Sequence, residues 1–120
     1  MTTRNVFRPG PERDIIQGMR IEKGACVIVT ACEPREKFWG IIDEISSAGV
    51  CLRGIDLNSY DELVRMLTRS EEGIFPATVF FPLRRIERIT LDETTGYLPS
   101  LKSQFELRTG LALEAFLGPS

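Results

Sequence analysis

Short apolar segments separated by turn residues recur along the chain. The first, residues 25–31, is uncharged and rich in β-branched side chains, which favours a strand buried on at least one face. The pattern predicts four further strands at residues 37–45, 50–55, 77–81 and 86–91. Because tight turns join the first three strands, we expect an antiparallel meander. The core of this protein is therefore predicted to be all-β.

Gly40 interrupts the otherwise bulky second strand. A glycine weakens a strand unless the chain bends there or another backbone approaches closely, so we expect Gly40 to bend the strand of a small barrel. Phe38 and Ile42 lie on one face of this strand. Trp39 and Ile41 lie on the other, so both faces are apolar. One face is expected to fill the barrel, and the other requires cover from a helix or a second subunit.

Helical spacing replaces the strand pattern between the third and fourth strands. Leu63, Met66 and Leu67 recur at that spacing, which predicts a helix over residues 59–69. A second helix is expected over residues 99–108, and Pro11 with nearby acidic residues favours a short N-terminal helix that ends before Gly18.

Length and composition fit one packed domain. The chain has 120 residues, of which 42% are hydrophobic and 27% charged, as in ordinary globular domains. We expect residues 1–10 to form a flexible arm and residues 11–110 to form the domain. Residues 111–120 form an apolar C-terminal tail, whose docking partner the sequence does not identify.

The charge balance and the missing residue types limit the chemistry. Fifteen Lys and Arg against 17 Asp and Glu give a net charge of -2, which argues against a wholly basic surface for nucleic acid or anionic membranes. The chain has no histidine, which removes the commonest general base and nitrogen ligand. We therefore expect no enzymatic activity, no cofactor and no metal site.

Three cysteines, Cys26, Cys32 and Cys51, form no C-x-x-C pair, and the N-terminus lacks a signal-peptide pattern. No apolar stretch reaches the roughly 20 residues that span a bilayer. These features predict a reduced cytoplasmic setting, no membrane partner and cysteines that serve as small apolar side chains.

Two segments resemble the motifs of the Sm-like family of small β-barrels. Residues 38–52 are similar to the first motif, in which a hydrophobic-x-Gly bend leads to a loop and a returning strand. Residues 80–89 are similar to the second motif, with matching length between the fourth and fifth strands. The resemblance implies a five-stranded Sm-like (SH3-type) open barrel, in a divergent bacterial member decorated by the three predicted helices.

The resemblance also implies assembly of identical subunits into a ring. In that family the fourth strand of one subunit pairs with the fifth strand of the next, so exposed strand edges are covered. The interface residues implied for this chain are Phe80, Phe81, Ile86 and Ile89.

RNA is the second partner that the resemblance implies. Family members commonly form a nucleotide pocket from Asp and Asn in the first motif and Arg-Gly in the second. The corresponding positions here are Ser46, Gly49, Pro82 and Leu83. The acidic residue, the amide and the arginine of the usual uridine pocket are thus all missing, although the positions of Ser46 and Gly49 stay candidates for RNA or partner binding.

An arginine cluster follows the fourth strand. Arg84, Arg85 and Arg88 can contact phosphates and stack on bases. Residues 80–93 also contain three acidic residues, so this stretch has no net charge. Ion pairs at a hydrated or intersubunit surface are the favoured interpretation, and RNA contact is the alternative.

The leading functional hypothesis is a non-enzymatic oligomeric module that binds a partner, with RNA as a candidate. The first alternative is a protein-interaction scaffold or regulatory domain that docks residues 111–117 onto another protein. The least favoured is a thiol-dependent small-molecule domain that uses Cys32 beside Arg35.

Overall fold

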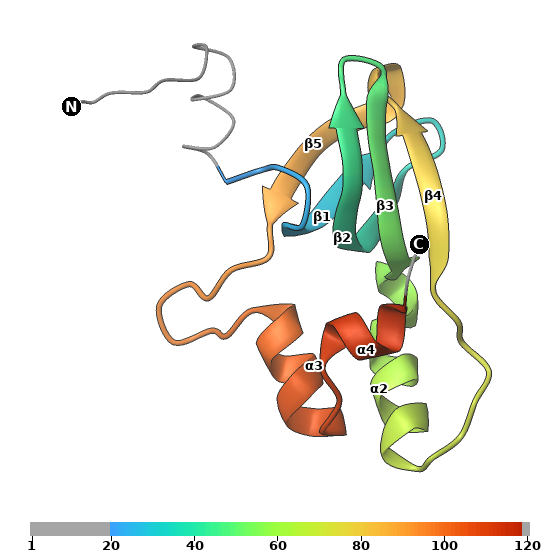
Figure 1. Cartoon of the computed structure of the whole chain (residues 1–120), viewed down its shortest axis with the longest axis vertical. Coiled ribbons are helices and arrows are strands. Elements are labelled where there is room, and N and C mark those ends of the chain that lie inside the picture. Colours follow the sequence, from blue (N-terminus) through green and yellow to red (C-terminus); the bar gives the residue numbers. More distant parts are fainter. Residues whose placement is uncertain (1–19, 119–120) are drawn as a thin grey trace.

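Five strands form one antiparallel sheet in the order β4-β3-β2-β1-β5, and helices gather at one end of it (Figure 1). The computed structural model describes residues 20–118, so the predicted arm and N-terminal helix lie outside the described residues. The strands are β1 (Cys26–Ala31), β2 (Glu36–Ser46), β3 (Gly49–Asp56), β4 (Ala77–Pro82) and β5 (Ile86–Leu91). The helices are η1 (Leu57–Ser59), α2 (Tyr60–Thr68), η2 (Leu83–Arg85), α3 (Leu101–Thr109) and α4 (Leu113–Leu117).

These elements confirm the predicted fold at the level of a mainly β domain with flanking helices. The predicted strands and the two predicted helices in the described chain lie within two residues of the observed bounds. The meander of β1, β2 and β3 is present, and α2 connects β3 to β4 as expected. The open five-stranded sheet is compatible with a small barrel-like fold.

One face of the sheet carries a core to which every strand contributes. Alternate side chains of a strand point to the same face, which brings together the buried residues of the first four strands. These are Val27, Val29, Ala31, Phe38, Ile42, Val50, Leu52 and Phe81, with Ile86, Ile89 and Leu91 of β5 packed against them. The rings of Phe38 and Phe81 meet edge to face at 5.7 Å and link β2 to β4.

The helices cover the other face, as the apolar character of both faces of β2 required. Trp39 is buried there in contact with the rings of Tyr60 on α2 and Phe105 on α3. The second core consists of Trp39, Ile55, Tyr60, Leu63, Val64, Phe105, Leu113 and Leu117. Cover for this face therefore comes from the chain's own helices.

The C-terminal tail belongs to this second core. Leu113 and Leu117 of α4 are 0% and 4% exposed. Their docking partner is therefore the chain itself, and this segment does not present these two side chains to another protein.

A row of paired residues crosses the whole sheet at the level where the helices begin. Its members are Leu91, Val27, Gly40, Gly54 and Ala77, in that order. The end of β5 and the start of β4 therefore lie at the same level on the two opposite edges.

No helix within residues 20–118 is long and apolar enough to cross a membrane.

Candidate functional site

The two edges of the sheet are the first candidate site. Within residues 20–118, β4 pairs only with β3 and β5 pairs only with β1. The outward-facing backbone groups of both strands therefore have no strand partner among residues 20–118. Backbone N–H and C=O groups in such a row form a template for another strand.

The residues predicted for the interface differ in what they offer. Phe80 is 54% exposed, so its side chain is accessible beside the β4 edge. Phe81 is buried in the first core, because neighbouring side chains on a strand point to opposite faces. Ile86 and Ile89 also pack against that core and are half-buried. The side chain of Phe81 therefore does not reach the edge, so only its backbone is available for strand pairing.

The second candidate site is the end of the sheet farthest from the helices. The β2–β3 turn meets η2 there, where the backbone N–H of Leu83 donates to the carbonyl of Ala48 at 2.9 Å. Gly49 pairs with both Ser46 and Pro82. The structure thus brings together the two loops that the sequence motifs singled out.

Both predicted residues of the β2–β3 turn shape its backbone. The Ser46 hydroxyl accepts a hydrogen bond from the Ala48 N–H at 3.1 Å and so stabilises the turn. Gly49 has a φ of 152°, and a β-carbon there would overlap the Phe81 carbonyl oxygen. This glycine is therefore required by the close approach of β4.

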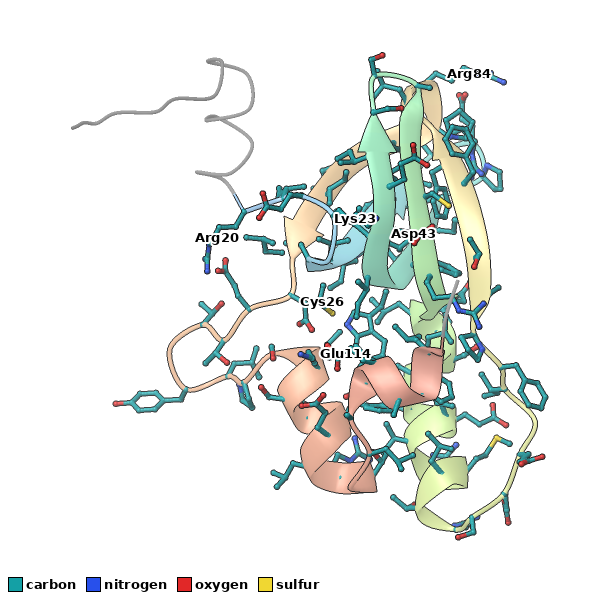
Figure 2. The ribbon with its side chains drawn as sticks, viewed as in Figure 1. Arg20, Lys23, Cys26, Asp43, Arg84 and Glu114 are labelled. Carbon is teal, nitrogen blue, oxygen red and sulfur yellow. The ribbon has the colours of Figure 1, made fainter. Side chains whose placement is uncertain are left out.

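The three candidate arginines separate into two kinds. Arg85 donates to the carbonyls of Cys32 and Pro34 at 3.0 and 2.8 Å and forms an ion pair with Glu36 at 2.9 Å. Its guanidinium group therefore holds the β1–β2 turn through these three contacts. Arg84 and Arg88 are exposed, and Figure 2 shows Arg84 at the far end of the sheet.

Two acidic residues of the 80–93 segment form surface ion pairs with arginines outside the cluster. Arg35 pairs with Glu87 at 3.2 Å, although both side chains stay largely exposed. Arg20 pairs with Glu93 in the same way at 3.1 Å. Exposed pairs of this kind contribute little to stability.

Two of the cysteines have polar neighbours. The Cys32 thiol lies 3.5 Å from the carbonyl oxygen of Arg85, and Arg35 is engaged with Glu87. Cys26 lies 3.5 Å from the carboxylate of Asp92, and burial together with this negative charge raises the pKa of its thiol. The thiol at Cys26 therefore stays protonated at neutral pH and is a poor nucleophile.

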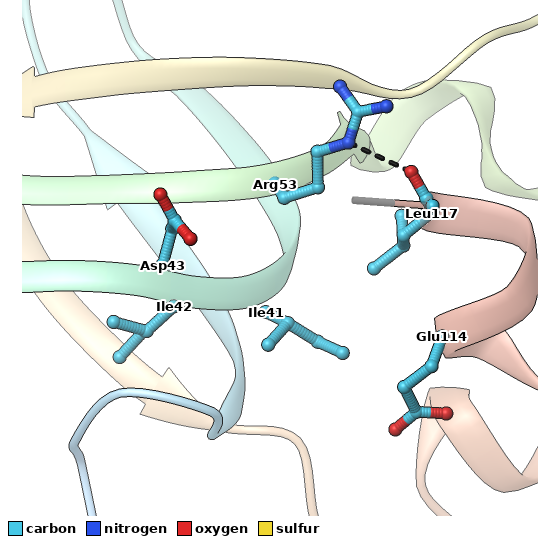
Figure 3. Close-up of a pocket in the computed structure, with 7 residues that line it drawn as sticks. Ile41, Ile42, Asp43, Arg53, Glu114 and Leu117 are labelled. Carbon is cyan, nitrogen blue, oxygen red and sulfur yellow. Dashed lines mark hydrogen bonds between the residues drawn. The ribbon is translucent and has the colours of Figure 1, made fainter. Parts of the chain in front are cut away.

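A cavity of about 160 Å³ lies between the sheet and α4 (Figure 3). Its lining includes Arg53, whose Nε donates to the Leu117 carbonyl at 2.9 Å. The same guanidinium reaches the Pro76 carbonyl and the Thr78 hydroxyl, each at 3.4 Å. Glu114, also in the lining, pairs with Lys102 of α3 at 3.1 Å. Both charged groups therefore hold α4 in place.

The sequence analysis missed two residues that hold the C-terminal helices against the sheet, Arg53 and Asp92. Arg53 lies in a strand where its charge suggests only an exposed position, and nothing local indicates its contact with α4. Asp92 accepts hydrogen bonds from the Trp39 indole at 3.1 Å and from the first N–H groups of α3 at 2.7 and 2.8 Å. An acidic residue several positions before a helix is a weak signal for such a cap.

Among residues 20–118, no group of three or more His, Cys, Asp or Glu side chains is placed to hold a metal ion. Comparison of the chain with protein-family models, curated proteins and solved structures finds no match.

Proposed function

We propose that this protein is a non-enzymatic, Sm-like assembly module that forms a head-to-tail homo-oligomer by pairing the β4 edge of one copy with the β5 edge of the next. The observation that carries the proposal is the pair of open edges on opposite sides of one sheet. Each edge is a strand of six residues, so the two match in length. The five strands and the three-residue connection at η2, which matches the length of the second motif, support the Sm-like assignment.

The directions of the two edges favour this pairing. In Figure 1, β4 runs away from the helices and β5 runs toward them. A second copy in the same upright orientation would place its β4 antiparallel to β5 of the first. The contact then joins two different surfaces, so it repeats from copy to copy and closes into a ring when the rotation allows.

A charge on the β4 edge tests the proposal. In light scattering the native protein should have a mass several times 13.5 kDa. The Phe80→Lys variant should dissociate at higher concentration, because a lysine on an edge strand opposes pairing. Leu107→Lys is the matched control, since Leu107 is 87% exposed on α3 and far from both edges in sequence.

Circular dichroism must show that both variants keep the native secondary structure. A native protein that stays monomeric at tens of micromolar would contradict the proposed assembly. Equal dissociation of the Phe80 and Leu107 variants would contradict the role of the β4 edge.

RNA is the second candidate partner, and it depends on Arg84 and Arg88. Both are exposed, and Arg84 lies beside the joined loops at the far end of the sheet. Filter retention of U-rich and A-rich oligonucleotides at two salt concentrations tests this candidate. Phosphate contacts predict retention that falls with salt and weakens when Arg84 and Arg88 are both replaced by glutamine. Without salt-sensitive retention, a protein-interaction scaffold is the better description.

A further inference from the structure

The connection between β5 and α3 carries an exposed apolar turn. The N–H and C=O groups of Thr95 and Leu98 exchange two hydrogen bonds of 2.9 Å, and Gly96 between them has a φ of 60°. Tyr97 is 106% exposed and Leu98 is 66% exposed. Figure 1 shows this connection projecting away from the helices on the β5 side. A rigid turn thus holds a large aromatic side chain entirely in solvent.

An apolar groove of about 200 Å³ lies on the opposite side of the molecule, just before β4. Its walls come from α2, from the chain that leads into β4 and from α4. The apolar lining includes Leu63, Met66 and Phe116, and Glu71 and Glu72 also line the groove. Phe75 is 70% exposed, so the groove has an accessible apolar side chain of its own.

The sheet register places the turn and the groove at the same level. The cross-sheet row that begins at Leu91 of β5 ends at Ala77 of β4. The exposed turn begins four residues after Leu91, and the groove segment ends one residue before Ala77. When β5 of one copy pairs antiparallel with β4 of the next, with Leu91 opposite Ala77, the turn of the first faces the groove of the second.

We propose that Tyr97 of one copy inserts into the groove beside β4 of the adjacent copy, and this proposal rests on the edge pairing described above. The tyrosine ring would pack against the apolar walls. Its hydroxyl would donate a hydrogen bond to the carboxylate of Glu71 or Glu72. An amphipathic aromatic side chain suits a groove that is apolar inside and acidic in part of its lining.

The area that a stable interface needs supports a contact beyond the strands. Six residues of strand are about 20 Å long and a sheet edge is about 10 Å thick, which gives about 200 Å². A specific interface buries about 800 Å² on each partner. A fully buried tyrosine adds about 150–250 Å², and Leu98 and Phe75 extend the same contact. The strand edges alone are thus smaller than a typical specific interface.

A site-directed cross-link tests the contact directly. Chains carrying only Leu98→Cys, which keeps Tyr97, are mixed with chains carrying only Phe75→Cys and treated with a short thiol-to-thiol reagent. We expect a covalent dimer from this mixture. A mixture of Leu107→Cys with Phe75→Cys should give only the background level of the native protein, whose three cysteines are half-buried.

Dissociation of the oligomer provides the second measurement. Tyr97→Ser should raise the dissociation constant by about tenfold or more, as expected for a buried aromatic anchor. Tyr97→Phe should have a smaller effect because it removes only the hydroxyl group, and Leu107→Ser should have none. A native oligomer without the cross-link and without a Tyr97→Ser effect overturns this inference and leaves the edge pairing intact. A monomeric native protein overturns both.

Discussion

Gly40 and Gly54 lie directly opposite each other where β2 pairs with β3. A β-carbon on Gly40 would overlap the Arg53 carbonyl oxygen, and one on Gly54 would overlap the Trp39 carbonyl oxygen. The two backbones thus approach more closely than any other residue type permits. The close approach of β3 requires a glycine at position 40. The sequence analysis expected either a bend or a close backbone at this glycine, and this contact is the second of the two.

Alanine at either glycine should destabilise the protein. We expect Gly40→Ala and Gly54→Ala each to lower the free energy of unfolding by about 1–3 kcal/mol, because the strands must separate to admit the methyl group. Urea denaturation followed by Trp39 fluorescence measures the effect, since Trp39 is the only tryptophan. Glu44→Ala on the exposed side of β2 is the control and should change the value by at most about 0.5 kcal/mol. Equal stability of all three variants would contradict the close approach.

Asp92 should anchor α3 to the sheet. Asp92→Ala removes the acceptor for the Trp39 indole and for the backbone N–H groups of Leu101 and Lys102. We expect a loss of about 2 kcal/mol or more in unfolding free energy, because donors in a partly buried site lose their partner. Glu93→Ala, which removes only an exposed ion pair, should cost at most about 1 kcal/mol. Similar losses in the two variants would show that Asp92 is an ordinary surface residue.

Replacing Arg85 by alanine should destabilise the protein, whereas replacing the adjacent Arg84 should not. Arg85→Ala leaves two carbonyl groups of the β1–β2 turn and the Glu36 carboxylate without their donor. Thermal unfolding should occur at a clearly lower temperature, with a stability loss of about 1–3 kcal/mol. Arg84→Ala should leave the melting temperature unchanged, because its side chain is exposed. Weaker RNA retention in Arg85→Ala at unchanged stability would contradict its structural role.

The ion pair between Lys102 of α3 and Glu114 of α4 should make the free energy of unfolding depend slightly on pH. A hydrogen bond from its own backbone N–H, together with Lys102, lowers the pKa of Glu114 below its ordinary value of 4.5. The folded protein therefore binds fewer protons there than the unfolded chain, and this stabilisation is lost as the pH falls through the lowered pKa. The hydrogen bond to Glu114 raises the pKa of Lys102 above 10.5, so its contribution is lost only at strongly alkaline pH.

Comparison of the native protein with Glu114→Gln measures this contribution. Urea unfolding at pH 7 should show a difference of at most about 1 kcal/mol, since both side chains are partly exposed. The difference should shrink as the pH falls below 4.5, because Glu114 then becomes protonated, first in the unfolded chain and at lower pH in the folded protein. A difference that grows toward acid pH would have the wrong sign for this ion pair.

The strands and α2 could be predicted because they depend on local patterns. The uncharged run at 25–31, the turns with glycine and the helical spacing after Asn58 each express short-range conformational preference. The double-sided apolar character of β2 also predicted that its outer face needs cover. The inward placement of the Arg85 and Phe81 side chains could not be predicted, because neither residue carries a local mark that distinguishes an exposed side chain from one turned inward.

By itself, the sequence determined the number of strands, the two-faced apolar second strand and the absence of histidine chemistry. Only the tertiary structure decided that the C-terminal helix covers the outer face, that Gly54 is the partner of Gly40 and that Asp92 caps α3. These relationships join residues far apart in the chain, such as Arg53 and Leu117. Their physical basis is burial and hydrogen bonding between distant segments, which hydrophobic periodicity and local propensity do not encode.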